Sequence, residues 1–140
     1  MGVTLAPFLM FEGQAAEALE LYAEAFEEAE VAEVRRFGEE GPGAVGTVER
    51  AVLRVGDREV RLFDSPVEHA FGFTPAVSLL VDLDSPAEVD AAFEKLSAGG
   101  KVLMPLDAYP FSSRFAWVAD RFGVSWQLSA VGSGAPASAA

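Results

Sequence analysis

The chain has 140 residues, about the size of one domain, and 51% of them are hydrophobic, which is enough to fill a core. Acidic residues outnumber basic ones by 22 to 10, and the net charge of −12 disfavours a surface that binds nucleic acid or an anionic membrane. The absence of cysteine excludes disulfides, thiolate metal sites and a cysteine nucleophile, and the single histidine, His69, excludes a multi-histidine metal site within one chain.

The first half of the chain predicts a strand, a helix and three further strands. Residues 5–11 are apolar and are followed by Glu12 and Gly13, as is typical of a short buried strand. Apolar residues then recur at spacings of three and four, which predicts a helix over residues 14–28 with glutamates on its other side. Alternating patterns predict strands over residues 31–37 and 51–55 and, after a Gly56-Asp57 turn, a third one around Val60 and Leu62.

The second half repeats this order of elements. Residues 75–81 predict a strand, and a helix start follows with a serine N-cap, a proline at the first helical position and a glutamate at the third. These three residues are Ser85, Pro86 and Glu88. The apolar stripe of this helix consists of Val89, Ala92, Phe93 and Leu96. Glycines 99 and 100 end the helix, and alternation predicts strands over residues 101–106, 115–119 and 124–128.

The repeated order predicts two copies of one supersecondary unit within a single domain over residues 1–131. The first module covers about residues 5–65 and the second about residues 73–129, each needing the other to cover its sheet. Residues 132–140 are rich in glycine, serine, alanine and proline and predict a flexible tail. No basic segment precedes the apolar start, and no apolar run is long enough to span a bilayer, so we expect a soluble cytoplasmic protein.

Three stretches of the sequence carry a family resemblance. They are Pro7-Phe8-Leu9-Met10-Phe11 with Ala15-Ala16-Glu17-Ala18 and Tyr22, Phe73-Thr74-Pro75-Ala76-Val77-Ser78-Leu79, and Asp120-Arg121-Phe122-Gly123-Val124-Ser125-Trp126-Gln127. In these stretches the chain resembles PhnB-like proteins, whose domain is often described as 3-demethylubiquinone-9 3-methyltransferase. This family lies in the vicinal oxygen chelate superfamily, with glyoxalases and bleomycin-resistance proteins. The resemblance implies an α+β fold in which two βαβββ modules form a glyoxalase-like pseudo-barrel with helices outside, and it implies a homodimer.

The resemblance also permits a test for a metal site. Metal-dependent members of the superfamily place a histidine or glutamine on the first strand of each module and a glutamate on the last. The first-strand positions here fall near Pro7 and Pro75, and the last strands offer Asp64 and Gln127. One carboxylate and one amide do not complete a divalent site, so the sequence predicts neither a metal nor another cofactor.

A glycine-rich segment bears on the methyltransferase description. Residues 41–46 fit the pattern GxGxxG, but the residues after them alternate as a strand rather than beginning a helix. Without a helix N-terminus there is no dipole to receive a phosphate or carboxylate, so we interpret the segment as a loop between strands.

The parity of the last strand indicates a ligand face. Ser125 and Gln127 share one side of this strand, and the bulky Trp126 lies on the other, where it would pack against a helix. The expected pocket combines these polar groups with apolar and aromatic ones, as small-molecule sites do. It comprises Phe8, Met10, Phe63, Ser78, Trp117, Ser125 and Gln127. Arg114 is a further candidate, as a partner for an anionic ligand.

Two functions follow from these candidates. The first is a small-molecule binding protein without metal, whose partner is an unidentified small molecule. The second is an enzyme of the superfamily type, a lyase, dioxygenase or isomerase, that is metal-assisted or uses His69 or Asp64 as a base. Asp82 and Asp84 precede the N-cap of the second helix, where the helix dipole favours carboxylates, so we assign them a structural role.

Overall fold

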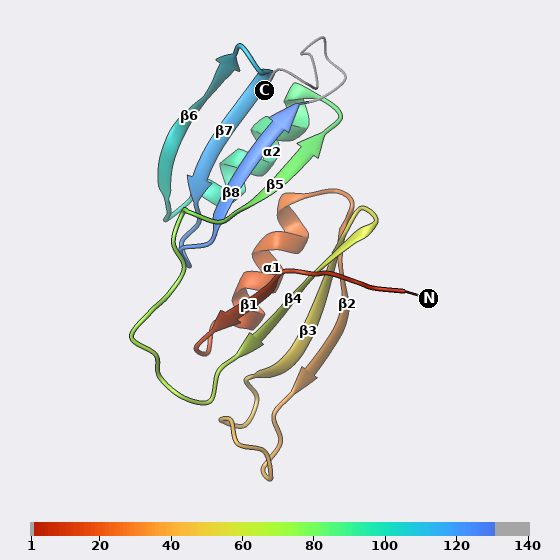
Figure 1. The fold of residues 1–140 in the computed structure, drawn as a ribbon, viewed down its shortest axis with the longest axis vertical. Helices are drawn as coiled ribbons and strands as arrows, with labels where there is room; N and C mark the ends of the chain where they lie inside the picture. Colours follow the sequence, from red (N-terminus) through yellow and green to blue (C-terminus); the bar gives the residue numbers. More distant parts are fainter. Residues whose placement is uncertain (1, 131–140) are drawn as a thin grey trace. The chain divides into compact units, whose positions relative to one another are not determined.

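The computed structural model describes residues 2–130 and divides the chain into two compact units, residues 1–70 and 71–140. Each unit contains a four-stranded mixed sheet and one helix (Figure 1). The predicted tail, residues 132–140, lies outside the described residues. Neither helix in the described part is both long and apolar enough to cross a membrane.

The first unit has the element order βαβββ. It contains β1 (Phe8–Phe11), α1 (Ala15–Ala25), β2 (Ala29–Arg36), β3 (Val48–Val55) and β4 (Arg58–Asp64). In its sheet the strands are ordered β1-β4-β3-β2, with β1 parallel to β4 and the other neighbours antiparallel. The predicted turn between β3 and β4 is confirmed, because Gly56 adopts the left-handed φ of 59° that a tight hairpin requires.

The second unit repeats the order βαβββ. It contains β5 (Ser78–Leu83), α2 (Pro86–Ser97), β6 (Lys101–Tyr109), β7 (Ser112–Ala119) and β8 (Ser125–Ala130). The strand order is β5-β8-β7-β6, again with one parallel pair, β5 and β8. The predicted α+β class and the two βαβββ modules are therefore confirmed.

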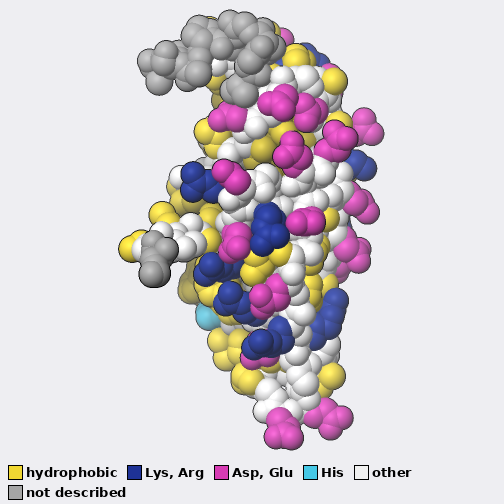
Figure 2. Space-filling model, turned by 90° about the vertical axis from the view of Figure 1, so that its right-hand side faces the viewer, with side chains coloured by type: hydrophobic (Ala, Val, Ile, Leu, Met, Phe, Trp, Pro, Cys, Tyr) yellow, Lys and Arg dark blue, Asp and Glu magenta, His cyan; other side chains and the backbone are white. Residues whose placement is uncertain are grey.

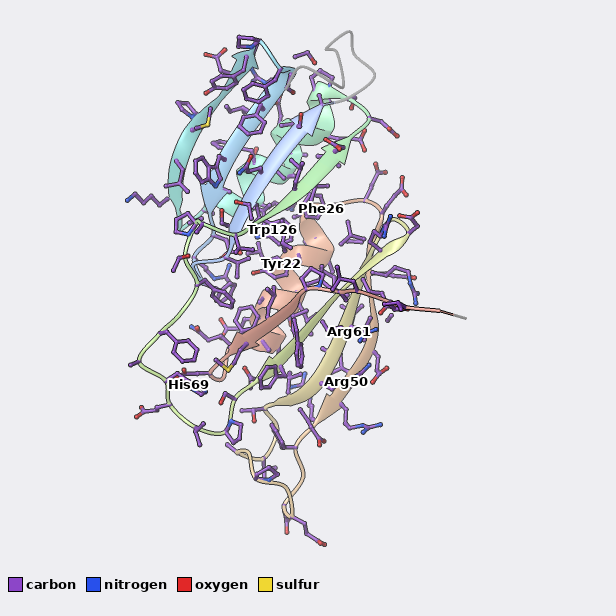
Figure 3. The ribbon with its side chains drawn as sticks, in the orientation of Figure 1. Tyr22, Phe26, Arg50, Arg61, His69 and Trp126 are labelled. Carbon is purple, nitrogen blue, oxygen red and sulfur yellow. The ribbon has the colours of Figure 1, made fainter. Side chains whose placement is uncertain are left out.

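Helix α1 buries the predicted apolar face against its own sheet. Leu19, Tyr22 and Phe26 are all nearly inaccessible to solvent. Figure 3 labels Tyr22 and Phe26. The helix ends at Ala25 rather than at residue 28, because Phe26 is already extended. Had it continued, Glu27 and Glu28 would have added negative charge to the negative end of the helix dipole.

Helix α2 begins as predicted, since the Glu88 N–H donates to Ser85 Oγ at 3.3 Å. Its buried stripe is narrower than the expected one. Val89, Ala92 and Leu96 are completely buried, whereas Phe93 is only half-buried. Phe93 stands about 100° around the helix from Ala92, so it packs at the border of the stripe rather than at its centre.

The first strand of each unit starts later than predicted. In the first unit β1 begins at Phe8, and Leu5 is exposed. In the second unit residues 74–77 form a turn, closed by the Val77 N–H donating to the Thr74 carbonyl at 3.4 Å. A strand over residues 75–81 would place Val77, like Leu79, on the helix side of the sheet. This placement is wrong, because Val77 lies in the turn and is 76% exposed.

Candidate functional site

The face of the second sheet that is turned away from α2 presents three rows of side chains, and each row holds one residue from each of the four strands. We call it the open face. Its rows follow from the strand register, because residues directly opposite each other in a sheet point to the same side. The first row is Ser78, Ser125, Ala119 and Lys101; the second is Leu80, Gln127, Trp117 and Met104; the third is Asp82, Ser129, Phe115 and Asp107.

The first two rows are joined by a chain of side-chain hydrogen bonds. Trp117 Nε1–H donates to Ser125 Oγ at 2.8 Å, and Gln127 Nε2–H donates to Ser78 Oγ at 3.3 Å. The two hydroxyl oxygens of Ser78 and Ser125 lie 2.7 Å apart. The structure thus brings four of the predicted pocket residues into one network on one face.

The prediction that Trp126 lies on the helix side of the sheet is confirmed as well. Val124, Trp126 and Leu128 are all buried, and α2 packs on the strands that carry them. Gln127, in contrast, retains partial exposure on the open face. The separation of polar and bulky apolar residues by alternation along β8 is therefore as the sequence predicts.

The turn before β8 is fixed by a buried carboxylate that the sequence analysis did not single out. Asp120 Oδ1 accepts from the Phe122 and Val124 N–H groups at 2.9 and 3.1 Å, and its Oδ2 accepts from Trp126 Nε1–H at 3.0 Å. Gly123 completes the turn with a left-handed φ of 94°. These contacts set the register in which Ser125 and Gln127 reach the open face.

The predicted pocket residues of the first unit also share one sheet face. The rings of Phe8 and Phe63 lie 4.7 Å apart, centroid to centroid, and Met10 is directly opposite Phe63 in the parallel register. That the pocket residues of both units line one cavity stays a prediction.

The same face of the first sheet carries paired charges. Arg50 bonds to Glu33 at 3.2 Å, and Arg61 bonds to Glu59 at 3.2 Å (Figure 3). Arg54 lies within 4 Å of acidic partners on both neighbouring strands. Figure 2 shows the same interleaving of basic and acidic side chains on the side of the molecule that it displays. These arginines are already neutralised by glutamates, so they do not form a free anion site.

Asp64 is held by backbone donors rather than poised as a base. Its Oδ1 accepts from the Gly13 and Ala15 N–H groups at 2.8 and 3.0 Å, and its Oδ2 accepts from the Val48 N–H at 2.9 Å. The side chain is buried. Because Gln14 makes no side-chain cap for α1, Asp64 supplies the acceptor that the start of this helix needs.

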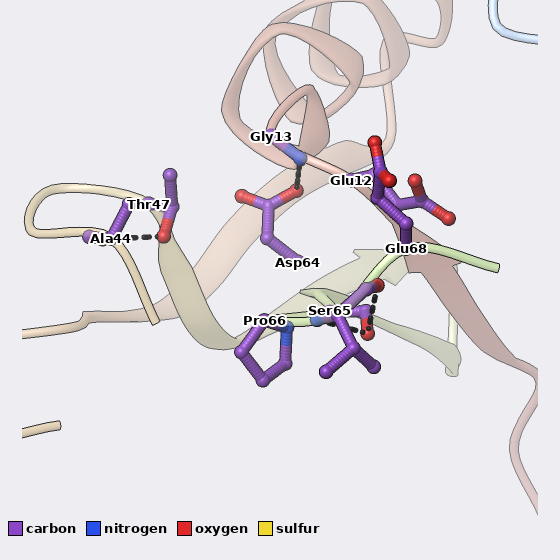
Figure 4. Close-up of a pocket in the computed structure, with 9 residues that line it drawn as sticks. Glu12, Gly13, Ala44, Thr47, Asp64, Ser65, Pro66 and Glu68 are labelled. Atoms are coloured by element: carbon purple, nitrogen blue, oxygen red, sulfur yellow. Dashed lines mark hydrogen bonds between the residues drawn. The ribbon is translucent and has the colours of Figure 1, made fainter. Parts of the chain in front are cut away.

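His69 lies beside a pocket in the first unit. Its Nε2 is 2.9 Å from Ser65 Oγ, and its backbone N–H donates to Glu12 Oε2 at 3.2 Å. The pocket has a volume of about 260 Å³ and is lined by Ser65, Glu12 and Glu68 together with Asp64 (Figure 4). Ser65 Oγ is also bonded to the Val67 backbone, which makes it part of a local turn.

Arg114 is committed to the helix side of its sheet. Its Nε donates to Asp90 Oδ1 on α2 at 2.7 Å. The expectation that Arg114 could pair with a ligand on the open face is therefore wrong. Alternation along β7 places Arg114 on the other side of the sheet from Trp117.

The side chains that the sequence offered as metal ligands, Asp64 and Gln127, do not form a site for a divalent metal. Asp64 points toward the start of α1, and its oxygens accept hydrogen bonds from three N–H groups. Gln127, in contrast, lies on the open face of the other unit. At the strand position of Gln127 the first unit has Phe63. Within residues 2–130 no three histidine or acidic side chains gather in a way that could hold a metal ion.

Comparison with known proteins extends these findings. Residues 3–129 match the family model described as 3-demethylubiquinone-9 3-methyltransferase. An uncharacterized protein from Mycobacterium tuberculosis is 32% identical over 134 residues, which cover 89% of this chain and 72% of that protein.

Solved structures share the fold over nearly the whole chain. A PhnB protein from Bacillus cereus is 44% identical and superposes with a TM-score of 0.86, covering 92% of this chain and all of that one (100%). A Pseudomonas aeruginosa protein is 26% identical, with a TM-score of 0.80 and coverage of 92% and 98%. A fosfomycin resistance protein from Mesorhizobium loti, 14% identical with 93% of each chain covered and a TM-score of 0.59, shares the fold alone. The glyoxalase-like fold is thereby confirmed.

Proposed function

The chain belongs to the 3-demethylubiquinone-9 3-methyltransferase family of PhnB-like proteins, in the vicinal oxygen chelate superfamily, and from this premise we propose that it binds a small molecule without a metal. The proposed site is the open face of the second sheet. The observation that carries the proposal is the hydrogen-bonded set of Trp117, Ser125, Ser78 and Gln127. Polar groups surrounded by apolar side chains orient a ligand, while the apolar surface contributes most of the affinity.

The surroundings of this network are suited to an apolar ligand body. Leu80, which flanks Gln127, is 61% exposed and so offers apolar surface beside the network. Trp117 and Met104 continue the same row and are partly exposed. At the β6–β7 turn, Tyr109, Phe111 and Phe115 pack together with ring centroids 4.8 to 5.6 Å apart.

Methyl transfer through a Rossmann-type nucleotide site has no support in this chain. The glycine-rich residues 41–46 lead into β3, as interpreted from the sequence, and no helix begins there. A Cβ on Gly43 would overlap the buried ring of Phe37, at 2.5 Å from its nearest carbons. The absence of a side chain at Gly41 and Gly43 therefore allows the loop to pack closely over Phe37.

The alternative, an enzyme that uses His69 as a base, is favoured by one observation: the 2.9 Å contact between His69 Nε2 and Ser65 Oγ beside the pocket of the first unit. Asp64 is less suited to this role, because three backbone donors occupy its oxygens.

Screening a fragment library by ligand-observed NMR tests the proposal. We expect fragments that shift the indole N–H resonance of Trp117 and that lose binding in Gln127→Leu but not in the control Glu94→Gln on the outer side of α2. Gln127→Leu should change stability little, since Gln127 is only half-buried. Fragments that bind equally to wild type and Gln127→Leu, or an absence of binders, would overturn the proposal. A hydrolytic or isomerising activity that His69→Gln abolishes would establish the alternative instead.

A further inference from the structure

The first row of the open face is chemically different from the other two. It holds both hydroxyls of the network, Ser78 and Ser125, and a lysine, Lys101, across the small side chain of Ala119. The third row, at the opposite end, holds Asp82 and Asp107. The open face therefore has a basic, hydroxyl-bearing end and an acidic end, with the apolar row between them.

The hydrogen bonds of the network leave one hydroxyl hydrogen unused. Ser125 Oγ accepts from Trp117 and Ser78 Oγ accepts from Gln127, so only one of the two hydroxyl hydrogens is needed for the bond between the serines. Ser125 is 2% exposed, whereas Ser78 is half-buried. An unused donor on Ser125 would be buried at a cost, so Ser125 donates to Ser78, and the free hydrogen belongs to Ser78.

Lys101 adds a charged donor to the same end. It is exposed, and within residues 2–130 no salt bridge engages it, although the chain carries 22 acidic residues. Lys101 and Ser78 lie on the two edge strands, roughly 15 Å apart across three strand spacings of about 5 Å, with Ala119 and Ser125 between them. A lysine has a flexible four-carbon stem, so the ammonium can swing over the methyl group of Ala119 toward Ser78, and a bound carboxylate can span the remaining gap. In contrast, the basic side chain of the neighbouring strand β7, Arg114, is bound to Asp90 on the helix side of the sheet.

We propose that the ligand of this site is a small amphipathic carboxylate whose carboxylate lies between the Ser78 hydroxyl and the Lys101 ammonium. This inference rests on the proposed function. Two donors match the two oxygens of a carboxylate, whereas a phosphate or phosphonate would leave a charged oxygen without a partner. The apolar body lies over Leu80 and Trp117 in the second row, and Asp82 and Asp107 repel the carboxylate from the other end.

A set of matched ligands tests this orientation on the full chain. The probes are 4-phenylbutyrate, its uncharged amide 4-phenylbutyramide, and phenylphosphonate, titrated while the indole N–H resonance of Trp117 is followed by NMR. We expect the carboxylate to bind about tenfold more tightly than the amide, in keeping with a charge-assisted hydrogen bond. Lys101→Met should remove this preference, Lys101→Arg should keep most of it, and the control Lys95→Met on α2 should leave it unchanged.

Each outcome decides the inference. Equal binding of carboxylate and amide, tighter binding of phenylphosphonate, or a preference that survives Lys101→Met would overturn it. If amide and carboxylate bind equally and both depend on Gln127, the carboxylate inference fails while the proposed function stands. If none of the probes shifts Trp117 and the fragment library also yields no binder, the proposed function fails as well.

Discussion

Replacing Asp64 should destabilise the protein strongly, because this side chain satisfies three backbone N–H groups at once. Those of Ala15 and Val48 are buried, and that of Gly13 is partly accessible to water. A buried donor left without an acceptor costs about 1–3 kcal/mol, so Asp64→Ala should lower the free energy of unfolding by about 2–6 kcal/mol. That is a large share of the roughly 5–15 kcal/mol by which domains are stable.

Asp64→Asn separates the effect of hydrogen bonding from that of volume. An asparagine keeps one oxygen but turns an NH₂ group toward a backbone donor, so it should lose one of the buried bonds, about 1–3 kcal/mol. Asp57→Asn is the matched control, since its side chain is 95% exposed and it should stay within about 0.5 kcal/mol of wild type. Urea unfolding of all three variants is followed by far-UV circular dichroism. Tryptophan fluorescence would not report on the first unit, because both tryptophans lie in the second unit. If Asp64→Ala unfolds at the same urea concentration as Asp57→Asn, the structural role assigned to Asp64 is refuted.

Further predictions concern packing and the metal. Leu96→Ala should cost about 2–5 kcal/mol in urea unfolding, and Phe93→Ala clearly less, because only Leu96 is fully buried; equal costs would contradict the helix orientation. Gly100→Ala should cost about 1–3 kcal/mol, since its Cβ would lie 2.2 Å from the Ala119 carbonyl oxygen, and a fully stable variant would show that the β6–β7 packing is wrong. Elemental analysis of the purified, dialysed protein should find no stoichiometric divalent metal; a stoichiometric amount would favour the enzyme alternative.

Local patterns were sufficient to predict most elements and the sides on which their residues lie. Ser85, placed three residues before Glu88, marks the start of α2 because a helix needs an acceptor there, and capping of this kind acts between neighbours in sequence. The alternation of Ser125, Trp126 and Gln127 likewise assigns faces, since the two-residue period of a strand is a property of the backbone itself.

Tertiary structure decided what joins residues that are distant in sequence. The start of α1 has no local cap, and its acceptor is Asp64, which is 49 residues away from Ala15. Lys101 joins the row of Ser78 and Ser125 only because β6 pairs with β7 in this register. From Lys101 to Asp107, β6 uses three residues for every two of β7, and these bulges interrupt the alternation from which a sequence pattern is recognised. Asp64 and Lys101 thus differ from Ser85 for one physical reason: their roles depend on strand pairing and chain packing, which the order of residues along a single segment does not specify.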